Sequence, residues 1–278
     1  MNDNEKKAPC AGIIDSHAHY FDNRFDSEYE GGADRLLTDV VFPSGIEAII
    51  NVGTNPDNCI RCIEQAQKYE KMYAAVGIHP EDGQHLSSDV AHEVAKIRAL
   101  LDTAEKRKEN KIVAIGEIGH DYYWQPVQKE LQRELFEAQM ALACEFDLPV
   151  IIHDREAHGD CFETVLKYPQ ARGVFHSFSG SAEMARELTR RGWYISFSGV
   201  ITFKNARRVR EVAQSVDPER VLIETDCPYL SPEPYRGRLN SSARLCHTAQ
   251  TLADIMGLSL CDTVALTNAN ARRLFGLI

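Results

Sequence analysis

The stretch that decides the fold is Ile13-Ile14-Asp15-Ser16-His17-Ala18-His19, a short apolar run ending in Asp-x-His-x-His. An extended strand places alternate side chains on one face, so Asp15, His17 and His19 are predicted to share a face. The two imidazoles then lie roughly 6–7 Å apart, and twisting at the strand end lets both reach one cation. The pair alone suits a polar turn equally well, so its meaning depends on what recurs along the chain.

Similar apolar runs recur along the whole chain, with amphipathic helical stretches between them. The runs lie near 11–15, 46–53, 72–78, 112–116, 148–152, 173–175, 193–197 and 221–225. The helical stretches lie near 33–41, 56–69, 89–108, 126–146 and from about 240 onward. Apolar runs without polar alternation are typical of parallel strands buried on both faces. Eight such units predict an α/β fold, a single (β/α)8 TIM barrel of the metal-dependent hydrolase type over residues 1–278.

An open doubly wound sheet is the alternative architecture. It normally carries a glycine-rich phosphate turn after an early strand, and no G-x-G-x-x-G follows any of these runs. The run at 193–197 is the weakest of the eight, because the serines of 194–199 also suit a loop. The charged run 105–109 is predicted to be a solvated face.

Length and composition indicate an ordinary globular protein. The 278 residues are 44% hydrophobic and 26% charged, and no apolar run approaches the roughly 20 residues of a membrane span. The polar start has no signal-peptide pattern, which predicts a cytoplasmic protein with a flexible N-terminus over 1–9. A net charge of −10 argues against wrapping duplex nucleic acid, although it leaves room for a local phosphate site.

The eight cysteines are predicted to be reduced thiols, several of them in the core. Cys59 and Cys62 form a lone C-x-x-C within a helical pattern. A zinc site would need a second pair, and a redox site would need a thioredoxin-like context, so a structural role is expected.

Residues that bind metals stand where the apolar runs end. They are His17, His19, His79, Glu117, His153, His176 and Asp226. Each one alone could be a hydrogen-bonded core residue. Together they would converge on the C-terminal face of a barrel, where so many ionisable groups would be costly to bury without a compensating cation.

The donors are nitrogen and oxygen only, which favours Zn²⁺, Mn²⁺, Co²⁺ or Mg²⁺. Six ligands are too many for one tetrahedral ion with an open position and suit two, with Glu117 as the natural bridge. Two ions about 3.5–4 Å apart activate a water between them, which points to hydrolysis of an ester or phosphoester.

Six motifs resemble the TatD family of metal-dependent deoxyribonucleases within the amidohydrolase superfamily. They are Asp15-Ser16-His17-Ala18-His19, Gly77-Ile78-His79-Pro80, Gly116-Glu117-Ile118-Gly119-x-Asp121-Tyr122, Ile152-His153-x-Arg155, His176-Ser177-Phe178-Ser179-Gly180 and Glu224-Thr225-Asp226-Cys227-Pro228-Tyr229-Leu230. They span the whole chain in the family's order. The resemblance implies a (β/α)8 fold and a nuclease site with two divalent metal cations.

The resemblance also implies a role for each site residue. One metal would be held by His17, His19, Glu117 and Asp226, and the other by Glu117, His153 and His176. Asp226 would also act as general base toward the bridging water. His79 would contact the scissile phosphate. Glu117 stands where related enzymes with a bridging carboxylated lysine have Lys, which favours the TatD branch.

The chain departs from the family pattern at two places. His120 stands where the family usually has Leu, and we expect it to pack rather than to lie near the site. The family's Asn-x-Pro is here Asn240-Ser241-Ser242, so Asn240 or Ser241 is expected to cap the next helix. The second departure concerns substrate preference more than the metal site.

Substrate contacts are expected from arginine and aromatic side chains beside the site. Arg155 and Arg236 suit phosphate through their fixed fork of donors, and surface solubility is an equal alternative for Arg238. The run Lys204, Arg207, Arg208 and Arg210 is first expected to be a solvated face. The aromatic run Tyr122, Tyr123 and Trp124 could stack on bases or pack over the barrel rim.

Three functions remain open from the sequence. The leading hypothesis is a deoxyribonuclease that trims the 3′ ends of single-stranded DNA, with no membrane and no obligate protein partner. The second is a metal-dependent hydrolase of another ester or amide, such as a d-aminoacyl-tRNA deacylase. The third is a non-catalytic nucleic-acid-binding module, against which the intact ligand set weighs.

Overall fold

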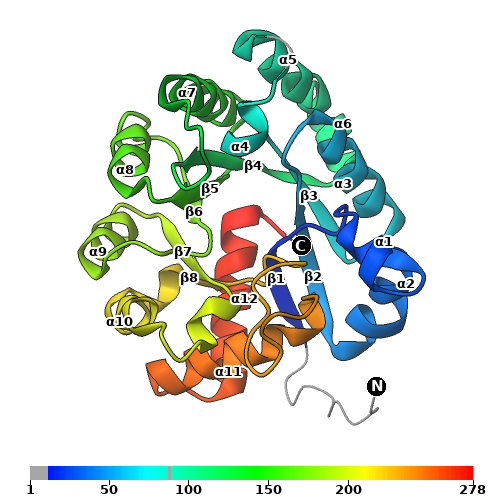
Figure 1. Cartoon of the computed structure of the whole chain (residues 1–278), viewed down its shortest axis with the longest axis vertical. Coiled ribbons are helices and arrows are strands. Elements are labelled where there is room, and N and C mark those ends of the chain that lie inside the picture. Colours follow the sequence, from blue (N-terminus) through cyan, green and yellow to red (C-terminus); the bar gives the residue numbers. More distant parts are fainter. Residues whose placement is uncertain (1–11, 87–88, 278) are drawn as a thin grey trace.

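The computed structural model describes residues 12–86 and 89–277, so the flexibility expected for residues 1–9 lies outside the described residues. Eight parallel strands form one sheet in the order of the sequence. They are β1 (Ile13–Ala18), β2 (Ile46–Val52), β3 (Met72–Val76), β4 (Ile112–Asp121), β5 (Val150–Arg155), β6 (Gly173–Phe175), β7 (Tyr194–Phe197) and β8 (Val221–Ile223). Figure 1 shows the helices as a ring around these strands. The predicted (β/α)8 barrel is confirmed, including its weakest strand, β7.

The helices alternate with the strands. They are α1 (Arg24–Glu28), α2 (Gly32–Leu36), α3 (Pro56–Lys68), α4 (Pro80–Gly83), α5 (Val90–Leu101), α6 (Ala104–Glu109), α7 (Lys129–Phe146), α8 (His158–Leu166), α9 (Ala182–Arg190), α10 (Arg207–Ser215), α11 (Leu245–Met256) and α12 (Leu260–Phe275). The charged run 105–109 is largely exposed, as predicted, but it forms the separate helix α6. The Thr103 side chain accepts a hydrogen bond from the Lys106 amide and so caps that helix.

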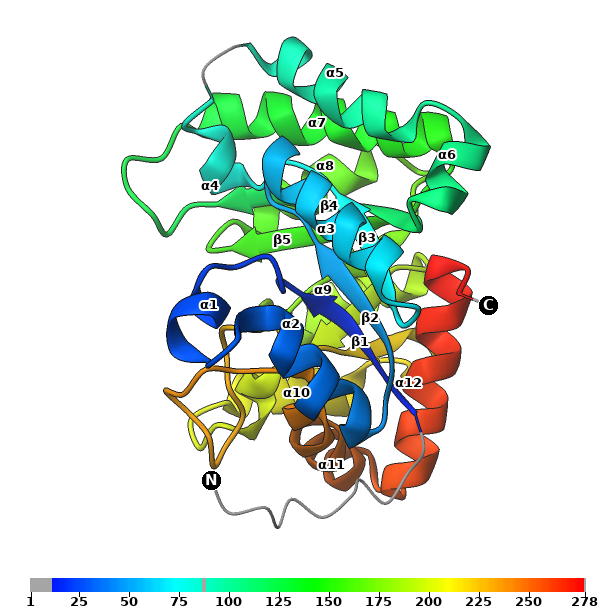
Figure 2. The ribbon, with the colours of Figure 1, turned by 90° about the vertical axis from the view of Figure 1, so that its right-hand side faces the viewer.

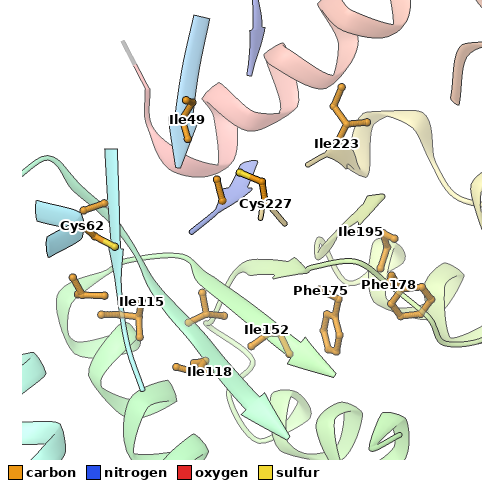
Figure 3. Close-up of a cluster of buried hydrophobic side chains, with 14 of the residues drawn as sticks. Ile49, Cys62, Ile115, Ile118, Ile152, Phe175, Phe178, Ile195, Ile223 and Cys227 are labelled. Atoms are coloured by element: carbon orange, nitrogen blue, oxygen red, sulfur yellow. The ribbon is translucent and has the colours of Figure 1, made fainter. Parts of the chain in front are cut away.

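The core has two layers, because alternate strand residues face opposite sides of the sheet. Inside the barrel, small and branched side chains such as Ile50, Ala75 and Ile151 pack together. Outside, residues such as Ile49 and Ile152 pack between the strands and the surrounding helices (Figure 3). The strands are thus apolar on both faces, which explains their unbroken apolar runs.

Helix α12 closes the N-terminal end of the barrel. Its Ala271, Leu274 and Phe275 belong to the interior cluster. The Asn270 side chain donates hydrogen bonds to the carbonyls of Pro218 and Val221 at the start of β8. In Figure 2 the strands run away from α12, so their C-terminal ends lie on the opposite side of the barrel.

The seam between β1 and β8 closes through backbone contacts at the C-terminal ends of the two strands. Ala18 and Cys227 form an isolated parallel bridge. The His19 amide donates to the Cys227 carbonyl at 2.8 Å, and the Asp226 amide donates to the His17 carbonyl at 2.9 Å. The seam therefore places the His-x-His pair directly beside Asp226.

Asp15 forms hydrogen bonds across this seam. Its carboxylate accepts hydrogen bonds from the Thr225 amide at 2.9 Å and hydroxyl at 2.6 Å, and from the Ser242 hydroxyl at 2.6 Å. Burial raises the pKa of Asp15 to about 6, although these donors oppose the shift. Its hydrogen bonds thus tie the first strand to the last, and the two imidazoles of the motif make different contacts.

The predicted cap at Asn240 or Ser241 is corrected by the structure. Ser241 precedes a short 3-10 helix (Ser242–Arg244), but its side chain makes no capping hydrogen bond. The Asn240 amide instead donates to the carbonyls of Thr225 and Tyr229. Its Oδ1, the atom that could cap a helix, accepts from the neighbouring Ser241 amide at 2.9 Å instead.

The cysteine prediction holds in the core and fails at one exposed position. Cys59, Cys62, Cys161 and Cys227 are buried free thiols, so the C-x-x-C pair is part of the core as expected. Cys261 is disulfide-bonded, so the prediction of a reduced thiol is wrong there. Cys261 is exposed near the start of α12, so it lacks the burial that keeps the core thiols inert. Within the described residues, every helix is too short or too polar to cross a membrane.

Candidate metal centre

Seven predicted site residues meet at the C-terminal ends of the strands. They are His17 and His19 from the end of β1, His79 after β3, Glu117 in β4, His153 in β5, His176 after β6 and Asp226 after β8. Each of the five histidines has a ring nitrogen within 3.8 Å of a carboxylate oxygen of Glu117 or Asp226. The barrel thus assembles residues that are as far as about 200 positions apart in sequence.

Glu117 lies at the middle of the cluster and divides it in two. Its Oε2 lies 3.4 Å from Nε2 of His17 and 3.6 Å from Nε2 of His19. Its Oε1 lies 2.6 Å from Nδ1 of His153 and 2.7 Å from Nε2 of His176. One carboxylate therefore faces a different pair of imidazoles with each oxygen.

Asp226 belongs to the first of these two groups. Its Oδ1 lies 3.2 Å from Nε2 of His19 and 3.6 Å from Nε2 of His17. The residue has a left-handed backbone with φ of 55°, a conformation that Asp tolerates better than most residues. This local conformation occurs where β8 has ended, next to the seam with β1.

Three of the imidazoles are oriented by an acceptor on the ring nitrogen that faces away from Glu117. The Val52 carbonyl lies 2.7 Å from Nδ1 of His19. Oε1 of Glu224 lies 3.2 Å from Nδ1 of His176, and Oδ2 of Asp121 lies 3.0 Å from Nε2 of His153. A carbonyl or carboxylate can only accept, so each outer nitrogen carries a proton, and in the neutral imidazole the inner nitrogen has the lone pair that a cation would bind.

This donor set fits divalent cations. The groups of His17, His19 and Glu117, and of Glu117, His153 and His176, each place their donor atoms within 4.8 Å of one another. His19 donates from Nδ1 to the Val52 carbonyl, so its Nε2 is the nitrogen that faces His17. The two Nε2 atoms lie only 3.0 Å apart. Outer carboxylate or carbonyl partners of this kind are typical of metal-binding histidines. The residues on each side of Glu117 are thus of the types that bind divalent cations.

The electrostatics of the cluster also favour a cation. Burial raises the pKa of Glu117, but the neighbouring His176 and His17 outweigh it and hold that pKa well below its usual range. Burial lowers the pKa of His153, but hydrogen bonds to Asp121 and Glu117 outweigh it and raise the pKa to about 9. The metal-free cluster therefore keeps Glu117 ionised and draws a proton onto His153, which a metal would displace.

His79 differs from His153 in its protonation. Its Nδ1 accepts a hydrogen bond from the Glu81 amide at the start of α4, so Nε2 carries the proton. That Nε2 lies 3.8 Å from Oε1 of Glu117. Burial and the nearby His153 lower the pKa of His79 to about 3, so the ring is neutral at pH 7. It presents an N–H donor to the site, whereas a metal ligand needs a lone pair.

The sequence prediction missed three buried residues that support the cluster. Asp121 and Glu224 orient His153 and His176, and the Ser196 hydroxyl of β7 donates to Glu224. The signal was present for both carboxylates, since Asp121 lies four residues after Glu117 in β4 and Glu224 two residues before Asp226. Ser196 had no such signal, because β7 carries no metal-binding residue.

Gly119 allows β4 to deliver both Glu117 and Asp121. Its φ is +145°, and an added Cβ would lie 2.0 Å from the His153 carbonyl oxygen of β5. Only glycine fits this close approach of the two strands. The side chain of His120 packs away from the cluster. It is buried between Phe136 and Tyr122, in agreement with the predicted packing role.

The residues expected to bind substrate contact other side chains of the protein. Arg155 at the end of β5 stacks on Tyr123, with 4.0 Å from guanidinium carbon to ring centre. Arg236 stacks on Phe203 at 4.3 Å. The Tyr122 hydroxyl donates to Asp160 of α8. Substrate contact by Arg155, Arg236 and Tyr122 stays a prediction.

The basic run around α10 is only partly a solvated face. Lys204, Arg207 and Arg208 are exposed. Arg210 is half-buried and donates to the carbonyls of Ile201, Thr202 and Phe203. It therefore stabilises the turn after β7 rather than extending an open basic surface.

A parallel (β/α)8 barrel with this cluster at its strand ends is typical of metal-dependent hydrolases. The sequence matches the model of the family described as TatD related DNase over residues 14–276. The chain belongs to this family.

Named relatives and solved structures agree with this assignment. The chain is 37% identical over 266 residues to the uncharacterized metal-dependent hydrolase YabD of Bacillus subtilis, covering 95% of this chain and 98% of that protein. It is 31% identical to the uncharacterized metal-dependent hydrolase YcfH of Escherichia coli K12, covering 95% of each. The crystal structure of YjjV, a TatD homologue from E. coli K12, superposes with a TM-score of 0.86 at 27% identity over 96% of this chain and 98% of that one.

Proposed function

We propose that this chain is a metal-dependent deoxyribonuclease that hydrolyses DNA phosphodiester bonds with two divalent cations. The observation that carries the proposal is the division of the cluster by Glu117, which faces one pair of imidazoles with Oε2 and another with Oε1. The family's description as TatD related DNase supports a phosphodiester as the bond that is cleaved.

The two sides of Glu117 supply two ligand sets. His17, His19, Glu117 and Asp226 would hold one cation. The other would be held by Glu117, His153 and His176. Zn²⁺, Mn²⁺, Mg²⁺ and Co²⁺ all accept this mixture of imidazole and carboxylate donors. When bound, the cations would neutralise the phosphate and lower the pKa of a water molecule.

Asp226 and His79 would act on the reacting atoms. Burial raises the pKa of Asp226, but hydrogen bonding to His19 and the nearby His17 outweigh it and keep the carboxylate ionised. Asp226 can therefore accept a proton as the oxygen of the attacking water bonds to phosphorus and the ester P–O bond breaks. The Nε2–H of His79 would donate to a non-bridging phosphate oxygen, where negative charge develops.

The proposed substrate is DNA with an unpaired end, trimmed from the 3′ terminus. Arg155 and Arg236 are exposed, and neither makes an ion pair with a described residue, so both can meet phosphates. The net charge of −10 disfavours a broad grip on duplex DNA, so binding would be local to the site.

The test is cleavage of an end-labelled single-stranded oligonucleotide with added Mg²⁺, Mn²⁺ or Zn²⁺. Wild type is compared with Glu117→Ala and Asp226→Asn, and with Glu105→Ala on exposed α6 as the matched control. We expect metal-dependent shortening that both site variants abolish and the control retains. Folded, metal-loaded protein that leaves the oligonucleotide intact would overturn the proposal. Hydrolysis of a d-aminoacyl-tRNA would then favour the other ester or amide hydrolase, and metal-independent DNA binding would favour a binding module.

A further inference from the structure

The loop after β4 carries an exposed aromatic pair on the side of the barrel where the metal cluster lies. Tyr123 is 46% and Trp124 is 48% exposed, values reached by few large apolar residues of the described chain. Figure 2 shows the connection from β4 to α7 projecting beyond the strand ends, on the side away from α12. The rings meet edge to face with 4.9 Å between their centres.

This aromatic pair is fixed to the metal cluster through a single carboxylate. Oδ1 of Asp121 accepts hydrogen bonds from the backbone amides of Tyr123 at 2.9 Å and Trp124 at 3.4 Å. Oδ2 of the same residue lies 3.0 Å from Nε2 of His153. Asp121 thus fixes the position of the backbone that carries the exposed rings relative to His153, one of the proposed metal ligands.

Arg155 lies beside the aromatic pair of Tyr123 and Trp124. It pairs with Asp121 in the β4–β5 register and lies two residues beyond His153 along β5. Its guanidinium lies 4.0 Å from the ring centre of Tyr123 and 5.6 Å from that of Trp124. It makes no side-chain hydrogen bond or ion pair with the residues described, so its donors are available to an anion.

Tyr122 contacts other residues than Tyr123 and Trp124 do. Its hydroxyl donates to Asp160, and the Lys129 ammonium lies 4.1 Å from its ring centre. The three consecutive aromatic residues therefore divide, with Tyr122 packing over the rim and Tyr123 and Trp124 facing solvent.

We propose that Trp124, Tyr123 and Arg155 form a nucleotide subsite, in which an unpaired nucleobase stacks on Trp124 and Arg155 binds a flanking phosphate. The inference rests on the proposed nuclease function and names its substrate class, a nucleic acid strand with unstacked bases at its end. An aromatic ring beside a guanidinium with free N–H donors can bind a base and a phosphate together. A paired base inside a duplex cannot offer its face, so the subsite selects single strands.

Intrinsic fluorescence tests the subsite without relying on catalysis. The chain has two tryptophans, and Trp193 is only 4% exposed, so Trp124 reports most of any change on binding. Metal-loaded Asp226→Asn is titrated with single-stranded oligothymidine. We expect saturable quenching that persists with Leu258→Ala, a change at an exposed apolar residue after α11. Its loss in Trp124→Phe, which removes the reporter, would assign the signal to Trp124.

Cleavage kinetics supply the second measurement. Trp124→Ala is expected to raise KM for a single-stranded oligonucleotide roughly tenfold, with Trp124→Phe close to wild type. The difference between Trp124→Ala and wild type should vanish on an oligonucleotide with abasic terminal residues. Normal cleavage by Trp124→Ala together with unquenched fluorescence would overturn the subsite and leave the nuclease proposal standing. Quenching without cleavage by wild type would support the subsite and overturn the nuclease.

Discussion

Nδ1 of His153 lies 2.6 Å from Oε1 of Glu117, on the opposite side of the imidazole from the nitrogen that contacts Asp121. A histidine held between two carboxylates can donate an N–H to both of them only when it is protonated. Because Asp121 accepts from Nε2–H, Nδ1 is the nitrogen that would give up its proton to a cation at the centre of the cluster. The tautomer of His153 is therefore a property of the β4–β5 pairing rather than of the residue itself.

Asp121→Ala should weaken metal binding although Asp121 is absent from both proposed ligand sets. Loss of an outer carboxylate partner of a metal-binding histidine typically costs 10- to 100-fold in affinity. Competition with a chromogenic chelator measures this, with Glu105→Ala as the control. Unchanged affinity in Asp121→Ala would mean that β5 packing alone orients the ring.

Metal binding should release protons and strengthen as pH rises from 7 to 9. The pKa of His153 is raised to about 9 in the metal-free cluster, so at pH 7 the cation must displace that proton. Displacement of one proton predicts close to a tenfold gain in affinity per pH unit below the pKa. Titration calorimetry in buffers of different ionisation enthalpy counts the protons released. An affinity independent of pH over this range would contradict the prediction.

His120→Leu should flatten the acid side of the stability profile. Burial lowers the pKa of His120 to about 4, and neither ring nitrogen has a hydrogen-bond partner among the described residues. The unfolded chain takes up this proton near pH 6.5 and the folded chain only near pH 4, so stability falls as pH drops between these values. The loss is about 3 kcal/mol for this residue, and leucine removes it. Urea unfolding at pH 7 and pH 4.5 measures it.

The control for His120 is His92→Leu on the exposed face of α5. His120→Leu should also gain about 1–3 kcal/mol at pH 7, because an unsatisfied polar group leaves the core. If both leucine variants show the same pH dependence as wild type, His120 contributes nothing to acid unfolding.

Ser242→Ala should destabilise the barrel seam. Its hydroxyl donates to Asp15, and its amide donates to the Tyr20 hydroxyl. Losing the hydroxyl leaves a buried carboxylate short of one donor, at a cost of about 1–3 kcal/mol in unfolding free energy. Ser242→Pro removes the amide donor as well and should cost more.

Thermal or urea unfolding checks both Ser242 variants against Ser27→Ala, an exposed serine of α1. A Ser242→Pro protein as stable as wild type would show that the seam re-forms with the residue that the family usually has at this position. That result would also make the Asn240-Ser241-Ser242 departure neutral for the fold.

The sequence by itself determined the architecture and the chemistry of the cluster. Eight apolar runs without polar alternation predict strands buried on both faces, and their number favours a closed parallel barrel, in which metal-binding residues at the strand ends meet at one face. His17, His19, Glu117 and Asp226 are recognisable for this reason. Their roles as ligands and as general base stay predictions.

Only the tertiary structure decided the details that depend on contacts across strands. Such details are the outer partners Asp121, Glu224 and Ser196, the orientation of the histidine rings, and the hydrogen bonds of Asp15 across the seam between β1 and β8. They arise from residues that are distant in sequence or on neighbouring strands. A one-dimensional pattern records which side chains can bind a proton or a metal. Which atom faces which partner is set by strand register and by the closure of the seam, and these follow from packing of the whole barrel.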